Sequence, residues 1–218
     1  VFTKLEWSVN PTDTGSAIGV RDRYIGLKKA GMGTFKFGTM SSNYKQTAAK
    51  MDPFWHTAVE GRATDATSNL SNGSGDDRGR MSNLFQFSMA PMGGIGFVFN
   101  AQLNGSGEMT TGLGLRYKAK GLYAFVDTLK IENDPDGNGV SNGGGNYPAG
   151  ESATKFGGKY SMGALTAGIT LEQTEDVVAF DYTTLMATYE MNANDTIAFT
   201  YGMASHITNS AADTYTMA

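Results

Sequence analysis

The chain has 218 residues and a formal charge of −4, with 17 Lys and Arg against 21 Asp and Glu, and it contains no Cys. The absence of a basic block argues against a nucleic-acid-binding protein, and the absence of Cys excludes disulfides and thiolate metal sites. No apolar run approaches the roughly 18–20 residues of a membrane-spanning helix. An aromatic content of 11% is too high for a disordered chain. The 29 glycines argue against long helices and favour an all-β protein.

Alternation with a period of two residues dominates the sequence and predicts β-strands. In residues 95–103, for example, Ile95, Phe97 and Phe99 share one face, while Gly96 and Asn100 lie on the other. Eleven strands are predicted in this way: 1–10, 21–29, 33–40, 81–89, 95–103, 110–119, 121–131, 152–161, 163–173, 178–190 and 195–205. We therefore expect one domain over residues 1–218.

The predicted connections alternate between short and long. The short ones are 30–32, 90–94, 120, 162 and 191–194, and the long ones are 11–20, 40–80, 104–109, 132–151 and 174–177. This alternation is typical of an outer-membrane β-barrel, which has short turns on one side and long loops on the other. Tilted strands of about 9–11 residues also match the thickness of a bilayer, and a sheet in lipid must close because its backbone groups have no other partners.

Aromatic side chains near the predicted strand ends are candidates for the girdles at the two membrane interfaces. They are Trp7, Tyr24, Tyr117, Tyr160, Tyr189 and Tyr201. The alternative is a soluble β-sandwich or lectin, in which the same side chains would belong to an ordinary core.

The predicted loop over residues 132–151 contains the segment from Asp134 to Gly139, which resembles the opening of a calcium-binding loop. Asp134, Asp136 and Asn138 supply oxygen ligands with the spacing that Ca²⁺ prefers. The twelfth position is Gly145 rather than the bidentate Glu, so a plain solvated loop is the alternative. No other cofactor is expected.

The connection over residues 40–80 is far longer than the usual limit of about 12–15 residues, so it calls for a function. Around it, RDRYIGLK (21–28), GTFKFGTM (33–40), SSNYK (41–45), DPF (52–54) and RMSNLFQFSMAP (80–91) occur in order. In this series the chain resembles the general porins of Gram-negative bacteria. It departs from their motifs at Thr39, where an Arg is frequent, and at Asn43, where the family has Pro in SPYK.

The resemblance implies an antiparallel barrel of 16 strands that forms a homotrimer in the outer membrane, in contact with its lipid. About eleven of those strands would be represented here, and residues 41–80 would fold into the lumen as a constriction loop. The implied function is a water-filled channel for passive diffusion of small hydrophilic solutes and ions.

The site of such a channel is an electric field across the lumen. We expect Asp52, Glu60 and Asp65 to be the acids of the loop, although Asp52 could equally cap a turn before Pro53. The facing bases of the barrel wall are expected to be Arg80, Arg116 and Lys118. The alternation also turns four further bases inward: Lys28, Lys36, Lys155 and Lys159.

Two other functions are compatible with the same barrel. One is a substrate-specific channel, for which an inward Tyr123 and Phe125 are a weak indication. The other is a structural or adhesive surface protein. An enzyme is not expected, because only His56 and His206 are available as bases and neither has a Ser/His/Asp setting.

Overall fold

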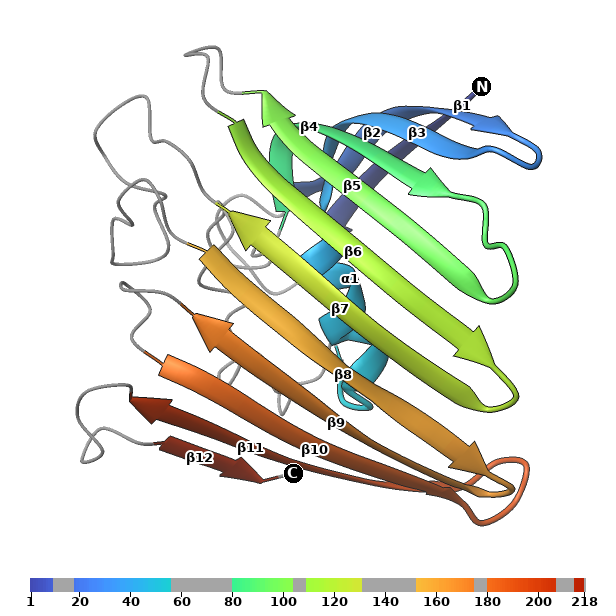
Figure 1. Cartoon of the computed structure of the whole chain (residues 1–218), viewed down its shortest axis with the longest axis vertical. Coiled ribbons are helices and arrows are strands. Elements are labelled where there is room, and N and C mark those ends of the chain that lie inside the picture. The colour runs from blue at the N-terminus through green and yellow to red at the C-terminus, as the bar shows by residue number, and fades with distance from the viewer. Residues whose placement is uncertain are drawn as a thin grey trace.

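The computed structural model describes residues 1–9, 18–55, 80–103, 109–130, 152–174, 180–206 and 214–217. Twelve strands form a single antiparallel sheet in which each strand pairs with its neighbours in sequence (Figure 1). The strands are β1 (Phe2–Val9), β2 (Ile18–Lys29), β3 (Gly33–Ser41), β4 (Arg80–Met89), β5 (Ile95–Leu103), β6 (Met109–Ala119), β7 (Leu122–Lys130), β8 (Ser152–Met162), β9 (Leu165–Thr174), β10 (Phe180–Glu190), β11 (Thr196–His206) and β12 (Thr214–Met217). One helix, α1 (Asn43–Met51), lies between β3 and β4 in sequence.

All eleven predicted strands are present, and the largest difference is the start of β2 at Ile18. Two elements were not predicted. The segment 40–80 was expected to be loop, yet it contains α1, and the C-terminal residues contain the short strand β12. Strand β12 has the sequence TYTM, which alternates between polar and apolar residues, but four residues are too few for such a pattern to indicate a strand. The total of 16 strands in a complete barrel stays a prediction.

The short connections join β2–β3, β4–β5, β6–β7, β8–β9 and β10–β11, as the alternation of loop lengths predicts. They lie together at one end of the sheet in Figure 1. In the β6–β7 turn, Lys120 has φ 43° and Gly121 has φ 83°. Two consecutive positive φ angles are typical of the type I′ turn, whose twist matches that of a two-residue hairpin.

The outer face of the sheet is apolar and solvent-accessible. Its exposed side chains include Leu5, Trp7, Ile25, Leu27, Phe37, Ile95, Leu113, Leu115, Val126, Phe156, Ile169, Leu185, Ile197 and Phe199. Water-soluble monomers rarely expose so continuous an apolar surface, whereas a lipid-facing barrel wall requires one. The soluble sandwich or lectin is therefore the wrong alternative.

Three of the predicted girdle residues, Tyr117, Tyr160 and Tyr189, are 39–50% exposed on the outer face near the short turns. The prediction was wrong for Tyr24, which lies on the inner face. Its ring contacts that of Phe2, and the Lys36 ammonium lies 5.2 Å from its centroid. The alternation that turns Lys28 inward also turns Tyr24 inward, because the two residues lie four positions apart on the same strand.

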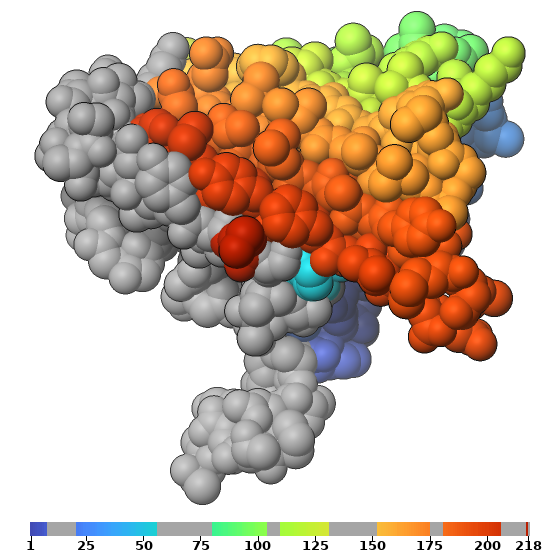
Figure 2. All heavy atoms as spheres, turned by 90° about the horizontal axis from the view of Figure 1, so that it is seen from below, coloured from blue at the N-terminus to red at the C-terminus, as the bar shows by residue number. Residues whose placement is uncertain are grey.

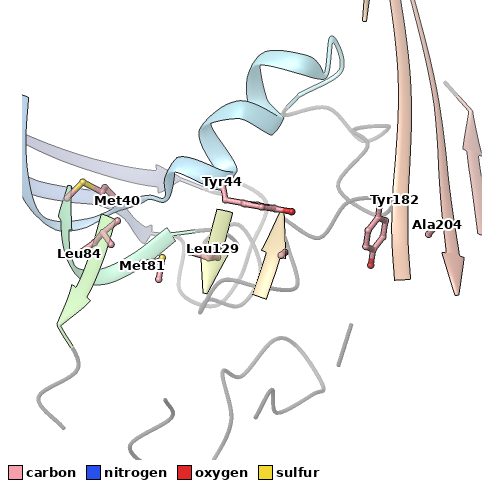
Figure 3. Close-up of a cluster of buried hydrophobic side chains, with 8 residues drawn as sticks. Met40, Tyr44, Met81, Leu84, Leu129, Tyr182 and Ala204 are labelled. Atoms are coloured by element: carbon pink, nitrogen blue, oxygen red, sulfur yellow. The ribbon is translucent and has the colours of Figure 1, made fainter. Parts of the chain in front are cut away.

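The sheet curls around α1, so its inner face is the one toward the helix (Figure 1). A cluster of buried side chains joins the helix to the strands, and Figure 3 shows Tyr44 reaching from α1 across the strand that carries Leu129. The cluster consists of Met40, Tyr44, Met81, Leu84, Leu129, Ala153, Tyr182 and Ala204. In the part of the chain that the structure describes, no helix is long and apolar enough to cross a membrane.

Candidate pore constriction

Helix α1 begins and ends at residues suited to those positions. The Ser42 hydroxyl accepts a hydrogen bond from the Lys45 backbone N–H at 3.2 Å, which satisfies one of the unpaired donors of the first turn. Asp52 is the C-cap, and Pro53 follows it. Because Pro disfavours a helical conformation in the preceding residue, the helix stops here.

The helix has two faces with different surroundings. Asn43, Tyr44, Lys45, Thr47, Ala48 and Met51 are buried. All of them except Lys45 follow the i, i+3, i+4 spacing that places side chains on one side. This side contacts β5–β9. The opposite side carries Lys45, Gln46, Ala49 and Lys50, which line a gap toward β1, β2 and β4. Figure 2 shows part of α1, in cyan, between the last strands and the first strands of the sheet.

Asn43 holds the N-terminal end of α1 against the inner face. Its Nδ2 donates to the Leu113 carbonyl at 2.8 Å and to Asp127 Oδ1 at 2.7 Å. Its Oδ1 accepts a short hydrogen bond from Asn100 Nδ2. Asn100 in turn accepts from Gln86 Nε2 at 2.8 Å. A connected set of amides therefore joins the helix to β4, β5, β6 and β7, and such buried networks favour one geometry when every member is satisfied.

Tyr44 holds the next part of the helix. Its hydroxyl donates to Glu172 Oε2 at 3.0 Å, and Glu172 Oε1 lies 3.2 Å from Lys155 Nζ. The Lys155 ammonium also donates to the Tyr44 carbonyl at 3.3 Å and lies 4.1 Å from the Tyr44 ring centroid. Lys155 and Glu172 are 0% and 2% exposed in their side chains. This ion pair is therefore buried between the sheet and the helix.

The C-terminal end of α1 packs against β7 and β8. Met51 forms a buried cluster with Tyr123 and Phe125, and Lys159 Nζ donates to the Lys50 carbonyl at 2.5 Å. A cation at this position also interacts favourably with the negative end of the helix dipole. Tyr123 and Phe125 face inward as alternation predicts, but the helix covers them, so they do not form an apolar track along the lumen.

The gap on the other side of α1 has a volume of about 380 Å³. On the strand side it is lined by Lys4, Glu6, Arg21, Asp22 and Arg80. These side chains are linked in pairs: Arg80 Nε to Asp22 Oδ1 at 2.8 Å, Lys4 Nζ to Asp22 Oδ2 at 2.8 Å and to Glu6 Oε2 at 2.6 Å, and Arg21 Nε to Glu6 Oε1 at 2.7 Å. In the described part of the chain, the gap therefore has bases on both sides, and the acids that line it, Glu6 and Asp22, lie on the strand side.

The predicted bases occupy three different settings. Arg80 lines the gap. Arg116 lies beneath α1, where its Nη2 donates to the Asn43 carbonyl at 3.0 Å and lies 3.2 Å from Asp127 Oδ1. Lys118 is exposed on the inner face, two residues closer to the short turns.

Of the three predicted loop acids, only Asp52 lies within the described residues. Asp52 Oδ1 accepts a hydrogen bond from the Phe54 backbone N–H at 2.8 Å, which is the capping role given above as the alternative. Glu60 and Asp65 lie outside the described residues, as do the three candidate calcium ligands and His56. In the described part of the loop, the gap-facing charges are those of Lys45 and Lys50.

Sequence reasoning missed Asn43, Asp127 and Tyr44 as the residues that position the helix. Asn43 was noticed only as a departure from SPYK. A polar residue that replaces Pro at the first helical position can add side-chain hydrogen bonds, which Pro cannot. That substitution was the available signal for an anchoring role.

These features define a class: an antiparallel membrane barrel wall with an apolar outer face and a connecting helix folded onto its polar inner face. The sequence matches the Gram-negative porin family over residues 1–218. The chain belongs to this family and is an outer-membrane protein, as expected.

Solved structures share the fold. An anion-selective porin from Comamonas acidovorans has a TM-score of 0.73 at 16% identity, covering 94% of this chain and 63% of that chain. OmpT of Vibrio cholerae, folded in vitro, has a TM-score of 0.63 at 14% identity, with 98% and 65% covered. An OmpT mutant without loop L8 gives 0.64 at 14% identity, with 97% and 70% covered. This chain thus spans 63% of the length of the Comamonas porin. No curated protein matches the sequence significantly.

Proposed function

We propose that the protein is a diffusion channel for small hydrophilic solutes and ions, and that its constriction prefers anions. The observation that carries the proposal is the gap between α1 and the strands β1, β2 and β4. Among the residues that the structure describes, five bases and two acids line it, and the bases lie on both sides: Lys4, Arg21, Lys45, Lys50 and Arg80 against Glu6 and Asp22. A ring of cationic side chains attracts anions and repels cations in a narrow pore.

The anion preference departs from the field expected from the sequence, in which loop acids face wall bases. At the gap, α1 supplies ammonium groups, and the acids found there among the described residues, Glu6 and Asp22, are already paired with wall bases. The proposal is also in keeping with the similar fold of the Comamonas protein, which is an anion-selective porin. Asp52, Glu60 and Asp65 remain proposed contributors to the field on the loop side.

The test is conductance of the purified full-length protein in a planar bilayer with a KCl gradient across it. Stepwise conductance with a reversal potential on the chloride side supports the proposal. A reversal potential on the potassium side would contradict the anion preference. No measurable conductance from folded protein would contradict the channel function itself. We also propose a homotrimer, for which conductance steps in groups of three are expected.

Two alternatives remain proposals of lower rank. A substrate-specific channel would show a flux that saturates with the concentration of one solute. A structural or adhesive surface barrel would show no conductance. We further propose that the protein catalyses no reaction, in keeping with a family of channels.

Calcium binding by Asp134, Asp136 and Asn138 also stays a prediction: Ca²⁺ should raise the unfolding temperature of wild-type protein, and not that of Asp136→Ala.

A further inference from the structure

A hollow on the outer face lies across β5, β6 and β7, close to the β6–β7 turn. Its volume is about 300 Å³. Strand register pairs Tyr117 with Ala124 and Leu115 with Val126, so the short Ala124 side chain leaves space between larger neighbours. The outward-facing side chains around the hollow are those of Ile95, Leu115, Tyr117, Ala124 and Val126. The hollow is therefore apolar and opens to the lipid rather than to the lumen.

The hollow lies at the depth where acyl chains meet lipid head groups. Tyr117, at its side, is one of the girdle residues near the short turns, and such rings mark the level of the head groups. Ala124 stands two residues from Leu122, where β7 begins after the turn. Because a strand rises about 3.4 Å per residue, Ala124 lies about 7 Å along the strand from the turn. An acyl chain that enters the hollow therefore places its head group beside the β6–β7 turn.

Lys120 occupies the tip of that turn. Its backbone has a φ of 43°, and the residue is exposed. A Lys side chain combines an apolar stem with an ammonium group that reaches toward the head-group level. Each Lys close to an anionic membrane surface also attracts that surface. Lys120 is therefore placed to pair with the phosphate of a lipid whose chain occupies the hollow.

The charges at this end of the sheet favour an anionic lipid at the β6–β7 turn over one at the β10–β11 turn. Lys28 and Lys29 are exposed at the β2–β3 turn, and with Lys120 they make the first part of this rim basic. Glu190 and Asp195 are exposed at the β10–β11 turn. Because opposite charges attract and like charges repel, negative head groups are drawn to the first part of the rim and repelled from the last.

We infer that the hollow and Lys120 form a binding site for one anionic glycerophospholipid, with an acyl chain against Ala124 and the phosphate at Lys120. Lipid tails are as apolar as the barrel wall, so close packing rather than the hydrophobic effect holds the chain in the hollow. The head group then supplies the preference for one lipid over another. This site goes beyond the proposed channel function, because the hollow lies outside the lumen.

The experiment counts the lipids bound to the folded full-length protein by native mass spectrometry in detergent. The two probes are phosphatidylglycerol, whose head group has a net negative charge, and phosphatidylcholine with the same acyl chains and no net charge. We expect saturable binding of about one phosphatidylglycerol per chain, at concentrations several-fold below those that phosphatidylcholine requires. Equal binding of the two lipids would overturn the inference.

Lys120→Gln keeps a polar side chain at the turn and removes its charge. It should weaken phosphatidylglycerol binding about fivefold, as expected for the loss of one Lys near an anionic surface. Lys118→Gln is the matched control, because it removes the same charge from the same hairpin on the inner face. This control should bind phosphatidylglycerol as the wild type does. Equal losses in the two variants would mean that the phosphate does not meet Lys120, and the site would be wrong.

Ala124→Leu fills the hollow and should reduce phosphatidylglycerol binding about fivefold, because the acyl chain loses its packing contacts. Ala187→Leu is the control. It enlarges an outward-facing Ala of β10, between Leu185 and Tyr189 near the acidic turn, and it should bind the lipid as the wild type does. If Ala124→Leu instead dissociates an oligomer and leaves lipid binding unchanged, a second copy of the chain occupies the hollow and the inference is wrong.

A bilayer recording separates this inference from the proposed function. Ala124→Leu should carry the same current as the wild type, because the hollow lies outside the lumen. If the wild type conducts but shows no preference for phosphatidylglycerol, the lipid site fails and the channel stands. If it prefers phosphatidylglycerol and does not conduct, the channel fails and the lipid site stands.

Discussion

The two walls that face α1 use the same residue types for different purposes. The anchor wall, formed by β5–β9, holds its ion pair Lys155–Glu172 at 0% and 2% exposure. The open wall, formed by β1, β2 and β4, holds Lys4–Glu6 at 43% and 30% exposure. Both are Lys–Glu pairs at hydrogen-bonding distance. What differs is the access of water, and water determines whether a charge contributes to stability or to the field in the pore.

The energies follow from this difference. Removing one partner of a buried pair leaves an uncompensated charge and costs about 3–5 kcal/mol. An exposed pair is worth about 0–1 kcal/mol, because water already solvates both charges. Changes at the anchor wall should therefore alter the stability of the protein, and changes at the open wall should alter ion selectivity.

The largest effect is expected for Lys155→Met, which fills a similar volume but takes the Lys155 ammonium away from the buried Glu172 carboxylate. We expect a loss of about 3 kcal/mol in the free energy of unfolding, measured by denaturant titration in detergent. Lys4→Met is the matched control on the open wall, with an expected loss below about 1 kcal/mol. Equal losses at the two positions would break the comparison.

A smaller effect is expected for Gly114→Ala. A Cβ at Gly114 would collide with Asp127 Oδ1 and lie 3.2 Å from Arg116 Nη1, so the anchor network must shift. Overpacking of this kind costs about 1–3 kcal/mol. Gly96→Ala is the control on the neighbouring strand, where a Cβ meets nothing within 4 Å. The unfolding free energy of Gly96→Ala should equal that of the wild type or rise slightly. A loss matching that of Gly114→Ala would show that the collision of the added Cβ is not the cause of the destabilisation.

The fold was largely predictable because each barrel strand repeats one simple signal. Alternation gives both the strands and their inward side, as at Arg116 and Lys155, and the alternation of loop lengths gives the end at which each turn lies. Helix α1 was missed because its nine residues are too few and too polar to show a clear apolar face. Its burial depends on strands far away in sequence, which no local pattern contains.

The candidate site was predictable only in part, for the same physical reason. The alternation of side chains along the strands correctly placed Arg80 and Arg116 on the inner face. It could not show that Arg80 lines a gap while Arg116 lies under a helix. That distinction depends on where α1 rests, and α1 rests where Asn43 and Tyr44 find Asp127 and Glu172. Those partners lie 84 and 128 residues away in sequence.

At the open wall, Arg80→Glu should move the reversal potential in a KCl gradient toward potassium. The change removes the Arg80–Asp22 pair and places a third acid beside Glu6 and Asp22. Charges about 4 Å apart in water interact by about 1 kcal/mol, so the ratio of ion permeabilities should change several-fold. Lys155→Met, measured in the same way on protein that remains folded, should leave the ratio near that of wild type. An unchanged ratio in Arg80→Glu would place Arg80 outside the constriction.

The smallest effect concerns salt and needs no substitution. The Debye length falls from about 10 Å at 0.1 M to about 3 Å at 1 M ionic strength. Because the charges of the open wall are in contact with water, the anion preference of the wild type should shrink over this range, measured as reversal potential at a fixed concentration ratio. The buried Lys155–Glu172 pair is shielded from ions, so the free energy of unfolding should change much less with KCl than with the Lys155→Met substitution. A preference that stays constant up to 1 M would mean that selection depends on direct contacts with the ion, and the charges of the open wall would then no longer be its main source.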